Sequence, residues 1–118
     1  MLHVNRKHLD PDIIVLEMKG RFVAGDETHQ VERSVDELLR ENRRKVIFDL
    51  AGVEHLDSMG VGAIVMCTAK LRKCGGELRL AGAWGPVDQL LKLTRVHQML
   101  GAFTSVSAAA QEFVLLEE

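Results

Sequence analysis

Residues 46–62 read VIFDLAGVEHLDSMGVG, and this stretch decides the fold class. Its first part, Val46–Leu50, is apolar except for Asp49, which is typical of a central strand covered on both faces. From Ser58 onward apolar residues recur at helical spacing, and Gly75-Gly76 ends the pattern in the manner of a C-terminal glycine cap. A buried strand that leads into a helix indicates an α/β fold.

The same alternation continues on both sides of this stretch. Leu2–Lys7 and Ile13–Met18 predict a hairpin, and a helix follows from Asp26, which is expected to cap its first turn, to about Asn42. Beyond Gly76 we expect a strand over 77–82, a helix over 86–94, a short strand over 103–106 and a last helix capped by Ser107. This order predicts an α/β fold with a mixed sheet of about five strands and about four helices covering it.

Size and charge restrict the class of protein. The 118 residues favour a single domain over 1–118, and a net charge of -2 supplies no field for a nucleic-acid partner. The basic run Arg43-Arg44-Lys45 is interpreted as a solvated helix end rather than a binding patch. No signal peptide or apolar span is found, so we expect a cytoplasmic protein without membrane insertion, whose Cys67 and Cys74 are reduced thiols.

The motifs of the common small α/β enzymes are missing from the sequence. It contains no phosphate loop, zinc-protease helix, paired-cysteine motif or nucleophile elbow. The five histidines never stand at metal-ligand spacing, and the third glycine of a dinucleotide fingerprint is replaced by Val65. We therefore expect no metal, no cofactor and no enzymatic activity.

Ser58 stands where the chain turns into the predicted helix. A helix N-terminus carries unpaired N–H groups and a partial positive charge, so a phosphate attached to Ser58 would be stabilised there. A structural interpretation is equally open, in which Asp57 or Ser58 is only the N-cap and Gly60 is a packing glycine.

The outer face of this helix begins unusually apolar for a surface in contact with water. Four residues make up this strip before the polar Lys70 and Lys73: Met59, Gly62, Ala63 and Met66. Because methionine adapts to a partner's surface, the first two turns could form a docking face beside Ser58. Alternatively, loops or the neighbouring helix cover these residues.

The order and spacing of several short motifs resemble a known family. They are Asp49-Leu50, Val53, Asp57-Ser58-x-Gly60-x-Gly62, Gly75-Gly76-x-Leu78 and Leu90-Leu91-x-Leu93-Thr94. Over nearly the whole chain this looks like a STAS domain of the bacterial anti-sigma factor antagonist type. The resemblance implies that Ser58 is phosphorylated by a serine kinase that is itself the anti-sigma factor. The unphosphorylated protein would bind that kinase and release the sigma factor, and a serine phosphatase would reset the switch.

The predicted partner surface surrounds Ser58, and the protein is expected to be a monomer or a weak dimer. The residues assigned to partner binding are Asp57, Ser58, Met59, Gly60, Gly62, Met66, Phe22, Val23 and Asp26. Two positions depart from the family pattern: Val23 replaces a common loop aspartate, for which Asp26 is the nearest acid, and Arg95 replaces a common glycine.

The sequence also allows two alternative functions. The chain could be a STAS scaffold or accessory subunit that does not switch, in a signalling assembly or a lipid transport system, and the loss of the acid at Val23 favours this. A more remote alternative is a hydrolase that uses Ser58 with His55, although no third group is evident to orient the histidine.

Overall fold

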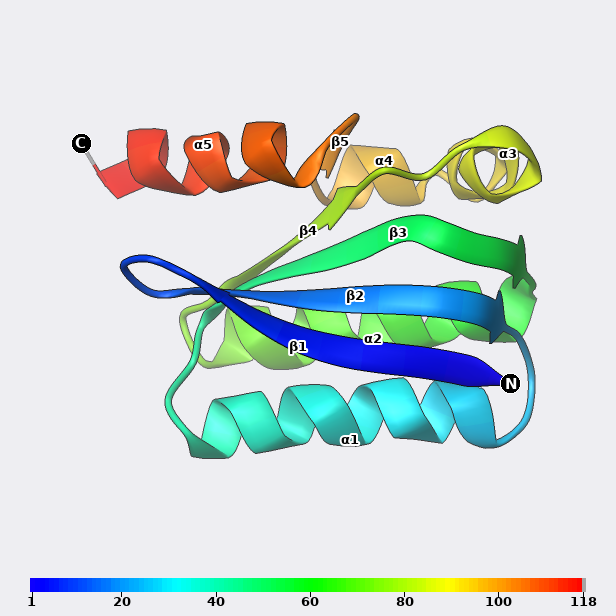
Figure 1. Ribbon diagram of the computed structural model, residues 1–118, viewed down its shortest axis with the longest axis horizontal. Helices are drawn as coiled ribbons and strands as arrows, with labels where there is room; N and C mark the ends of the chain where they lie inside the picture. The colour runs from blue at the N-terminus through cyan, green and yellow to red at the C-terminus, as the bar shows by residue number, and fades with distance from the viewer. Residues whose placement is uncertain (118) are drawn as a thin grey trace.

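The computed structural model describes residues 1–117 and shows a five-stranded mixed sheet (Figure 1). Its strands lie in the order of the chain: β1 (Leu2–Leu9), β2 (Ile13–Phe22), β3 (Lys45–Leu56), β4 (Glu77–Ala81) and β5 (Ala102–Phe103). β1 and β2 form the antiparallel hairpin, and every later pair is parallel. The predicted α/β fold with a mixed sheet of five strands is confirmed.

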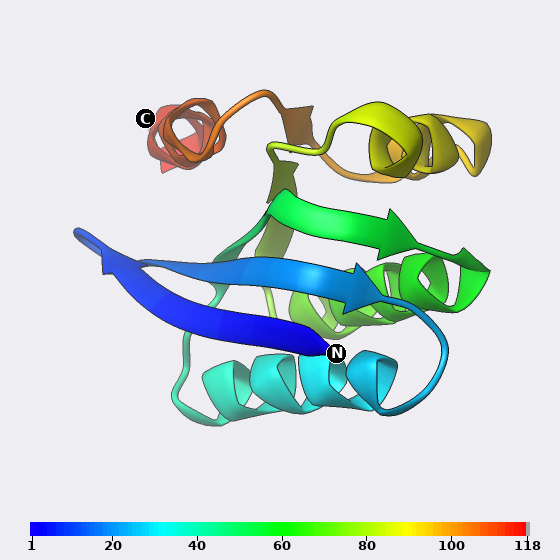
Figure 2. The same ribbon diagram turned by 45° about the vertical axis from the view of Figure 1, so that its right-hand side comes forward.

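Helices cover both faces of the sheet. α1 (Asp26–Arg40) and α2 (Ser58–Lys73) lie side by side on one face, below the sheet in Figure 1. α3 (Gly85–Leu93), α4 (Val96–Met99) and α5 (Val106–Glu117) lie on the other face, where α5 stands apart from α3 and α4 (Figure 2). This arrangement gives three layers, with the sheet in the middle.

The core explains why the Val46–Leu50 run is continuously apolar. Val46, Phe48 and Leu50 belong to the larger core, to which α1, α2, α3 and α4 all contribute. Ile47 belongs instead to the smaller core that includes Phe113 of α5. Because successive strand residues face opposite sides, a strand covered on both faces needs apolar residues at consecutive positions.

α2 has the predicted buried stripe and the predicted end. Val61, Ile64, Thr68 and Leu71 are buried, and Val65 is half-buried against the same core. At the C-terminus the Gly76 N–H donates to the Leu71 carbonyl at 2.7 Å and the Gly75 N–H donates to the Arg72 carbonyl at 3.1 Å. Gly75 has φ +80°, so this is a Schellman motif, and a glycine suits it because a Cβ disfavours that conformation.

Several element boundaries differ from those that the sequence predicts. β3 continues to Leu56, well beyond the Val46–Leu50 run from which the strand is predicted. The β2–β3 register shifts twice, and these irregularities allow the long strand to stay paired up to Phe22 and Leu56. Among residues 1–117 there are five helices rather than about four, since α4 is an additional single turn.

Two predicted helix caps are wrong. α1 has Gly25, with φ +123°, at its N-cap, so that Asp26 is the first helical residue and makes no capping hydrogen bond. α5 begins at Val106, and the Ser105 hydroxyl accepts a hydrogen bond from the Ala108 N–H at 3.1 Å. Ser105 therefore caps this helix, and Ser107 lies inside it.

Arg95 separates α3 from α4 in a left-handed conformation, with φ 61° and ψ 22°. Non-glycine residues are disfavoured there by about 1–2 kcal/mol, which exceeds the entropic cost of a glycine. We expect Arg95→Gly to raise the free energy of unfolding by roughly 0.5–1 kcal/mol. Urea denaturation would measure the gain. Arg95→Ala is the matched control, since it removes the side chain without removing the Cβ. If Ala stabilises as much as Gly, the backbone conformation is not the cause.

Candidate functional site

The site lies where β2 and β3 end. Phe22 and Leu56 are partners in the parallel register, so the β2–α1 loop and the start of α2 emerge next to each other at the right-hand end of Figure 1. Ligand and partner sites of α/β sheets commonly lie at the carboxyl ends of the strands. Residues 23–26 and 57–59, which are far apart in sequence, thus share one surface.

Asp57 joins the two segments through both carboxylate oxygens. Its Oδ1 accepts a hydrogen bond from the Gly60 N–H at 2.9 Å, which makes Asp57 the N-cap of α2. Its Oδ2 accepts a second hydrogen bond from the Ala24 N–H, also at 2.9 Å. The capping interpretation holds for Asp57. The carboxylate also fixes the β2–α1 loop relative to Ser58.

The protonation state of Asp57 is tied to these hydrogen bonds. Partial burial acts to raise the pKa of Asp57, but backbone N–H donors, led by Ala24 and Gly60, outweigh it and hold the pKa below the usual value. A carboxyl whose pKa is lower in the folded state stabilises the fold above its unfolded pKa. This stabilisation is lost as the pH falls through the folded pKa.

We expect Asp57→Ala to lower the free energy of unfolding by about 1–2 kcal/mol near neutral pH, because the capping bond and the loop bond are both removed. Denaturant unfolding of both proteins over a range of pH would measure this. Above about pH 4, near the unfolded pKa of an aspartate, the difference should be constant. It should shrink as the pH falls further. A difference that grows in acid would contradict the assignment.

Ser58 is the first residue of α2 and is exposed. Within residues 1–117, no hydrogen bond engages its hydroxyl, because Asp57 performs the capping. A group attached to this oxygen would lie at the positive end of a 16-residue helix.

The structure divides the predicted partner-binding residues into three groups by their exposure. Ser58, Met59, Gly62, Met66 and Asp26 are exposed, with 58% of Met59 and 52% of Met66 accessible. Asp57 and Val23 are half-buried. Phe22 and Gly60 are buried, so direct contact of a partner with these two is ruled out, and they support the surface from beneath.

Gly60 is required by packing. A Cβ at this position would approach the Phe22 carbonyl oxygen to 2.3 Å and Leu56 Cδ1 to 2.7 Å. A Cβ at Gly62, in contrast, would meet nothing within 4 Å. The two glycines of the Asp57–Gly62 motif therefore have different roles. Gly60 allows α2 to begin close to β2, and Gly62 leaves the outer face of the helix without a side chain at that position.

A groove runs between the N-terminal halves of α1 and α2, beside Ser58, with a volume of about 490 Å³. We call it the methionine groove, and its lining residues are Gly25, Asp26, Thr28, His29, Glu32, Met59, Gly62, Ala63 and Met66. The expected docking strip on α2 forms one wall. Only Ala63 is covered among its four residues.

The sequence pattern does not predict the other wall of the groove. It comes from the first two turns of α1 and includes Thr28, His29 and Glu32. The spacing of Val31, Val35 and Leu38 already indicated which side of α1 is buried. It did not indicate that the flank bearing His29 and Glu32 would face α2.

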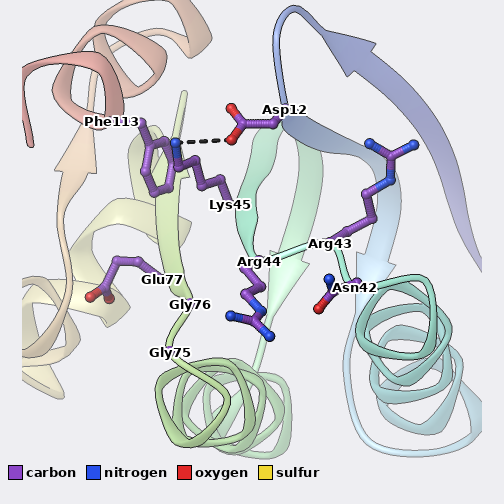
Figure 3. A pocket seen from close by; sticks show the side chains of 9 residues that line it. All are labelled: Asp12, Asn42, Arg43, Arg44, Lys45, Gly75, Gly76, Glu77 and Phe113. Carbon is purple, nitrogen blue, oxygen red and sulfur yellow. Dashed lines mark ion pairs between the residues drawn. The ribbon is translucent and has the colours of Figure 1, made fainter. Parts of the chain in front are cut away.

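A second hollow of about 460 Å³ lies at the opposite end of the sheet (Figure 3). It contains the run Arg43-Arg44-Lys45, which follows the end of α1. Figure 3 shows Arg43 and Arg44 pointing in opposite directions, and Lys45 Nζ pairs with Asp12 Oδ2 at 3.0 Å. The three cationic groups therefore do not converge on one point.

The remaining candidate groups of the sequence are His55, the two cysteines and possible metal ligands. No hydrogen bond joins His55 to Ser58 within residues 1–117, and His55 is exposed on β3. Burial raises the pKa of the Cys67 thiol to about 12, and Cys74 is a free, exposed thiol. Over the same residues, no three His, Cys, Asp or Glu side chains are grouped to hold a metal ion, and no helix has the length and hydropathy needed to cross a membrane.

Comparisons with known proteins agree with this geometry. A curated Thermotoga maritima protein is 26% identical over 102 residues, which cover 86% of this chain and 90% of that protein; its name, marked as provisional, is anti-sigma factor antagonist. A crystal structure from the same organism, named in the same provisional way, has a TM-score of 0.85 at 25% identity and 92% coverage of both chains.

SpoIIAA, an anti-sigma factor antagonist, shares the fold. Its unphosphorylated form has a TM-score of 0.71 at 14% identity, over 95% of this chain and 97% of that one, and the Bacillus protein has also been solved in a phosphorylated form. The sequence profile of the STAS domain matches residues 6–109. With the five-stranded mixed sheet and the Asp57-Ser58 junction, this match shows that the chain belongs to the STAS domain family.

Proposed function

We propose that this protein is an anti-sigma factor antagonist. Its unphosphorylated form binds an anti-sigma factor that is also a serine kinase, and the sigma factor is released. The observation that supports this most is the exposed, unengaged Ser58 hydroxyl beside the methionine groove. The related proteins named anti-sigma factor antagonist support the same conclusion.

Phosphorylation of Ser58 would act as a local electrostatic switch. It adds about 1.5 to 2 negative charges, which the N-terminus of α2 tolerates in the free protein. In the complex the same charge has to be desolvated against a surface that fits a neutral hydroxyl. An unpaired charge at an interface costs about 2–5 kcal/mol, which corresponds to a loss of affinity of roughly thirty-fold to several thousand-fold. No change of fold is required.

The protein itself is a binding module in this proposal and performs no chemistry. The kinase supplies the phosphoryl transfer, and a separate serine phosphatase removes the phosphate and resets the switch. The domain acts in the cytoplasm as a monomer or weak dimer, without a cofactor. The contact surface consists of Ser58, Met59, Gly62 and Met66 on α2, together with Val23 of the β2–α1 loop and Asp26 at the start of α1.

A direct test is to incubate the protein with ATP and the serine kinase encoded nearest its gene. Mass spectrometry should find one phosphate, located on Ser58. Ser58→Ala should remain unmodified, and Ser107→Ala, which removes an exposed serine of α5, should be modified like the wild type. Phosphate on another residue, or on none with any candidate kinase, would overturn the switch.

One observation favours a second function. Val23 occupies the loop position where many family members carry an acid, and its side chain is half-buried. An apolar residue there suits a STAS scaffold or accessory subunit that stays bound without switching. In that case the protein would co-purify in a stable complex and never be phosphorylated.

A further inference from the structure

The α2 wall of the methionine groove is apolar. Met59 and Met66 are seven residues apart on α2, so their Cα atoms are separated by about 10 Å along the helix axis. Both side chains are more than half exposed, and Ala63 lies between them. Two turns of another helix have the same length as this separation.

Gly62 leaves a notch in the middle of this wall, because it has no side chain. An interior glycine destabilises a helix by about 0.8–1.0 kcal/mol relative to alanine. Nothing within the described residues requires it, because there a Cβ at Gly62 would meet no atom within 4 Å. The absence of a side chain instead allows a second backbone or a bulky side chain to approach α2 closely.

The rim of the groove is acidic. Asp26 and Glu32 line it from α1, and no lysine or arginine is among the described residues that line it. His29 Nδ1 lies 3.7 Å from Glu32 Oε2, so one imidazole stands beside the Glu32 carboxylate. Farther along, the first lysine of α2 is already paired, with Lys70 Nζ 3.0 Å from Asp36 Oδ1. An occupant with positive charge at its edges would complement this rim.

We propose that the methionine groove binds an amphipathic helix of the partner, with apolar side chains seated over Met59, Gly62 and Met66 and a Lys or Arg side chain facing Asp26 and Glu32. This is the helix-in-groove mode of recognition. The inference rests on the proposed function for the identity of the partner, the anti-sigma kinase. It adds the chemistry of the contacting element and assigns Glu32 the charge recognition that Val23 cannot supply.

The groove is tested first without the kinase. The probe is a synthetic helical peptide of about four turns, with leucines on one face and lysines at the edges of that face. NMR titration of the wild-type protein should shift the methyl signals of Met59 and Met66. A matched peptide with glutamate in place of each lysine should not bind. Equal binding of the two peptides would overturn the proposal.

Two variants probe the rim and the notch separately. Glu32→Lys reverses a rim charge and Gly62→Leu fills the notch, and each should weaken peptide binding at least about tenfold. Both sites tolerate the change structurally, since Glu32 is partly exposed and the space over Gly62 is open. Glu37→Lys makes the same charge change at an exposed α1 position that does not line the groove, and it should bind the peptide like the wild type.

The same variants titrated with the kinase separate this inference from the proposed function. If the kinase binds wild type, Glu32→Lys and Gly62→Leu equally well, the groove proposal fails and the proposed function stands. If the kinase fails to bind but the peptide results hold, the proposed function fails and the groove chemistry stands. Sedimentation tests a second copy as the occupant: a wild-type dimer that Glu32→Lys converts to a monomer would overturn the helical partner.

Discussion

Replacing Ser58 with aspartate is expected to weaken binding of the anti-sigma partner by at least about thirty-fold, because an unpaired interfacial charge costs 2 kcal/mol or more. Ser58 is exposed and Asp57 provides the capping hydrogen bond, so the fold has no need of the serine hydroxyl. Isothermal titration of the two proteins with the partner would measure the loss.

Ser58→Ala is the control for this substitution. It removes the hydroxyl without adding charge, and it should bind the partner like the wild type and stay active in the presence of ATP. Circular dichroism and urea denaturation should show that both variants are folded. If Ser58→Asp binds as tightly as the wild type, then charge at this position does not control the interface.

Of the substitutions proposed here, Gly60→Ala is expected to lower the free energy of unfolding most. Its Cβ would lie 2.3 Å from the Phe22 carbonyl oxygen, and a backbone atom in a sheet cannot move away as a flexible side chain can. Relief of the clash requires α2 to shift away from β2, which should lower the free energy of unfolding by roughly 2–3 kcal/mol, the upper part of the range for overpacking. Urea denaturation would measure the loss.

Gly62→Ala is the matched control, two residues away in the same helix. Its Cβ meets open space, so the helix propensity of alanine should raise the free energy of unfolding by up to about 1 kcal/mol. The two Gly→Ala changes should therefore act in opposite directions. Equal losses from both would show that the close approach to Phe22 is not what makes Gly60 sensitive.

The sequence predicts the large elements of the fold because their signals are local. The continuous Val46–Leu50 run and the helical stripe after Ser58 both reflect burial, and the structure contains both. The end of α2 could be predicted as well, since a left-handed C-cap requires a residue like Gly75. The strand–helix order then left a mixed sheet as the consistent arrangement.

The details that were missed depend on tertiary context. Strand β3 extends to Leu56 because β2 stays paired with it through two register shifts, which no local pattern reveals. The α4 turn follows a left-handed Arg95, where a glycine would have been the usual signal. A residue that can also cap a helix precedes each misassigned cap: Gly25 precedes Asp26, and Ser105 precedes Ser107.

In the candidate site, too, the local features could be predicted from the sequence and the tertiary contacts could not. The role of Asp57 at the start of α2 follows from a local capping motif, and the exposure of Met59 and Met66 follows from helical spacing. The hydrogen bond from Ala24 to Asp57 and the α1 wall of the groove arise only when α1 packs beside α2. Phe22 is predicted to bind the partner, yet its side chain is fully buried in the core.

The central claim is that phosphate on Ser58 switches partner binding off without changing the fold. The most direct measurement is an isothermal titration of the partner with the protein fully phosphorylated on Ser58 and with the unphosphorylated protein, at the same salt concentration. We predict that phosphorylation lowers the affinity by between about thirty-fold and several thousand-fold, and that circular dichroism shows the same helix content in both forms. Equal affinities of the two forms would contradict the account.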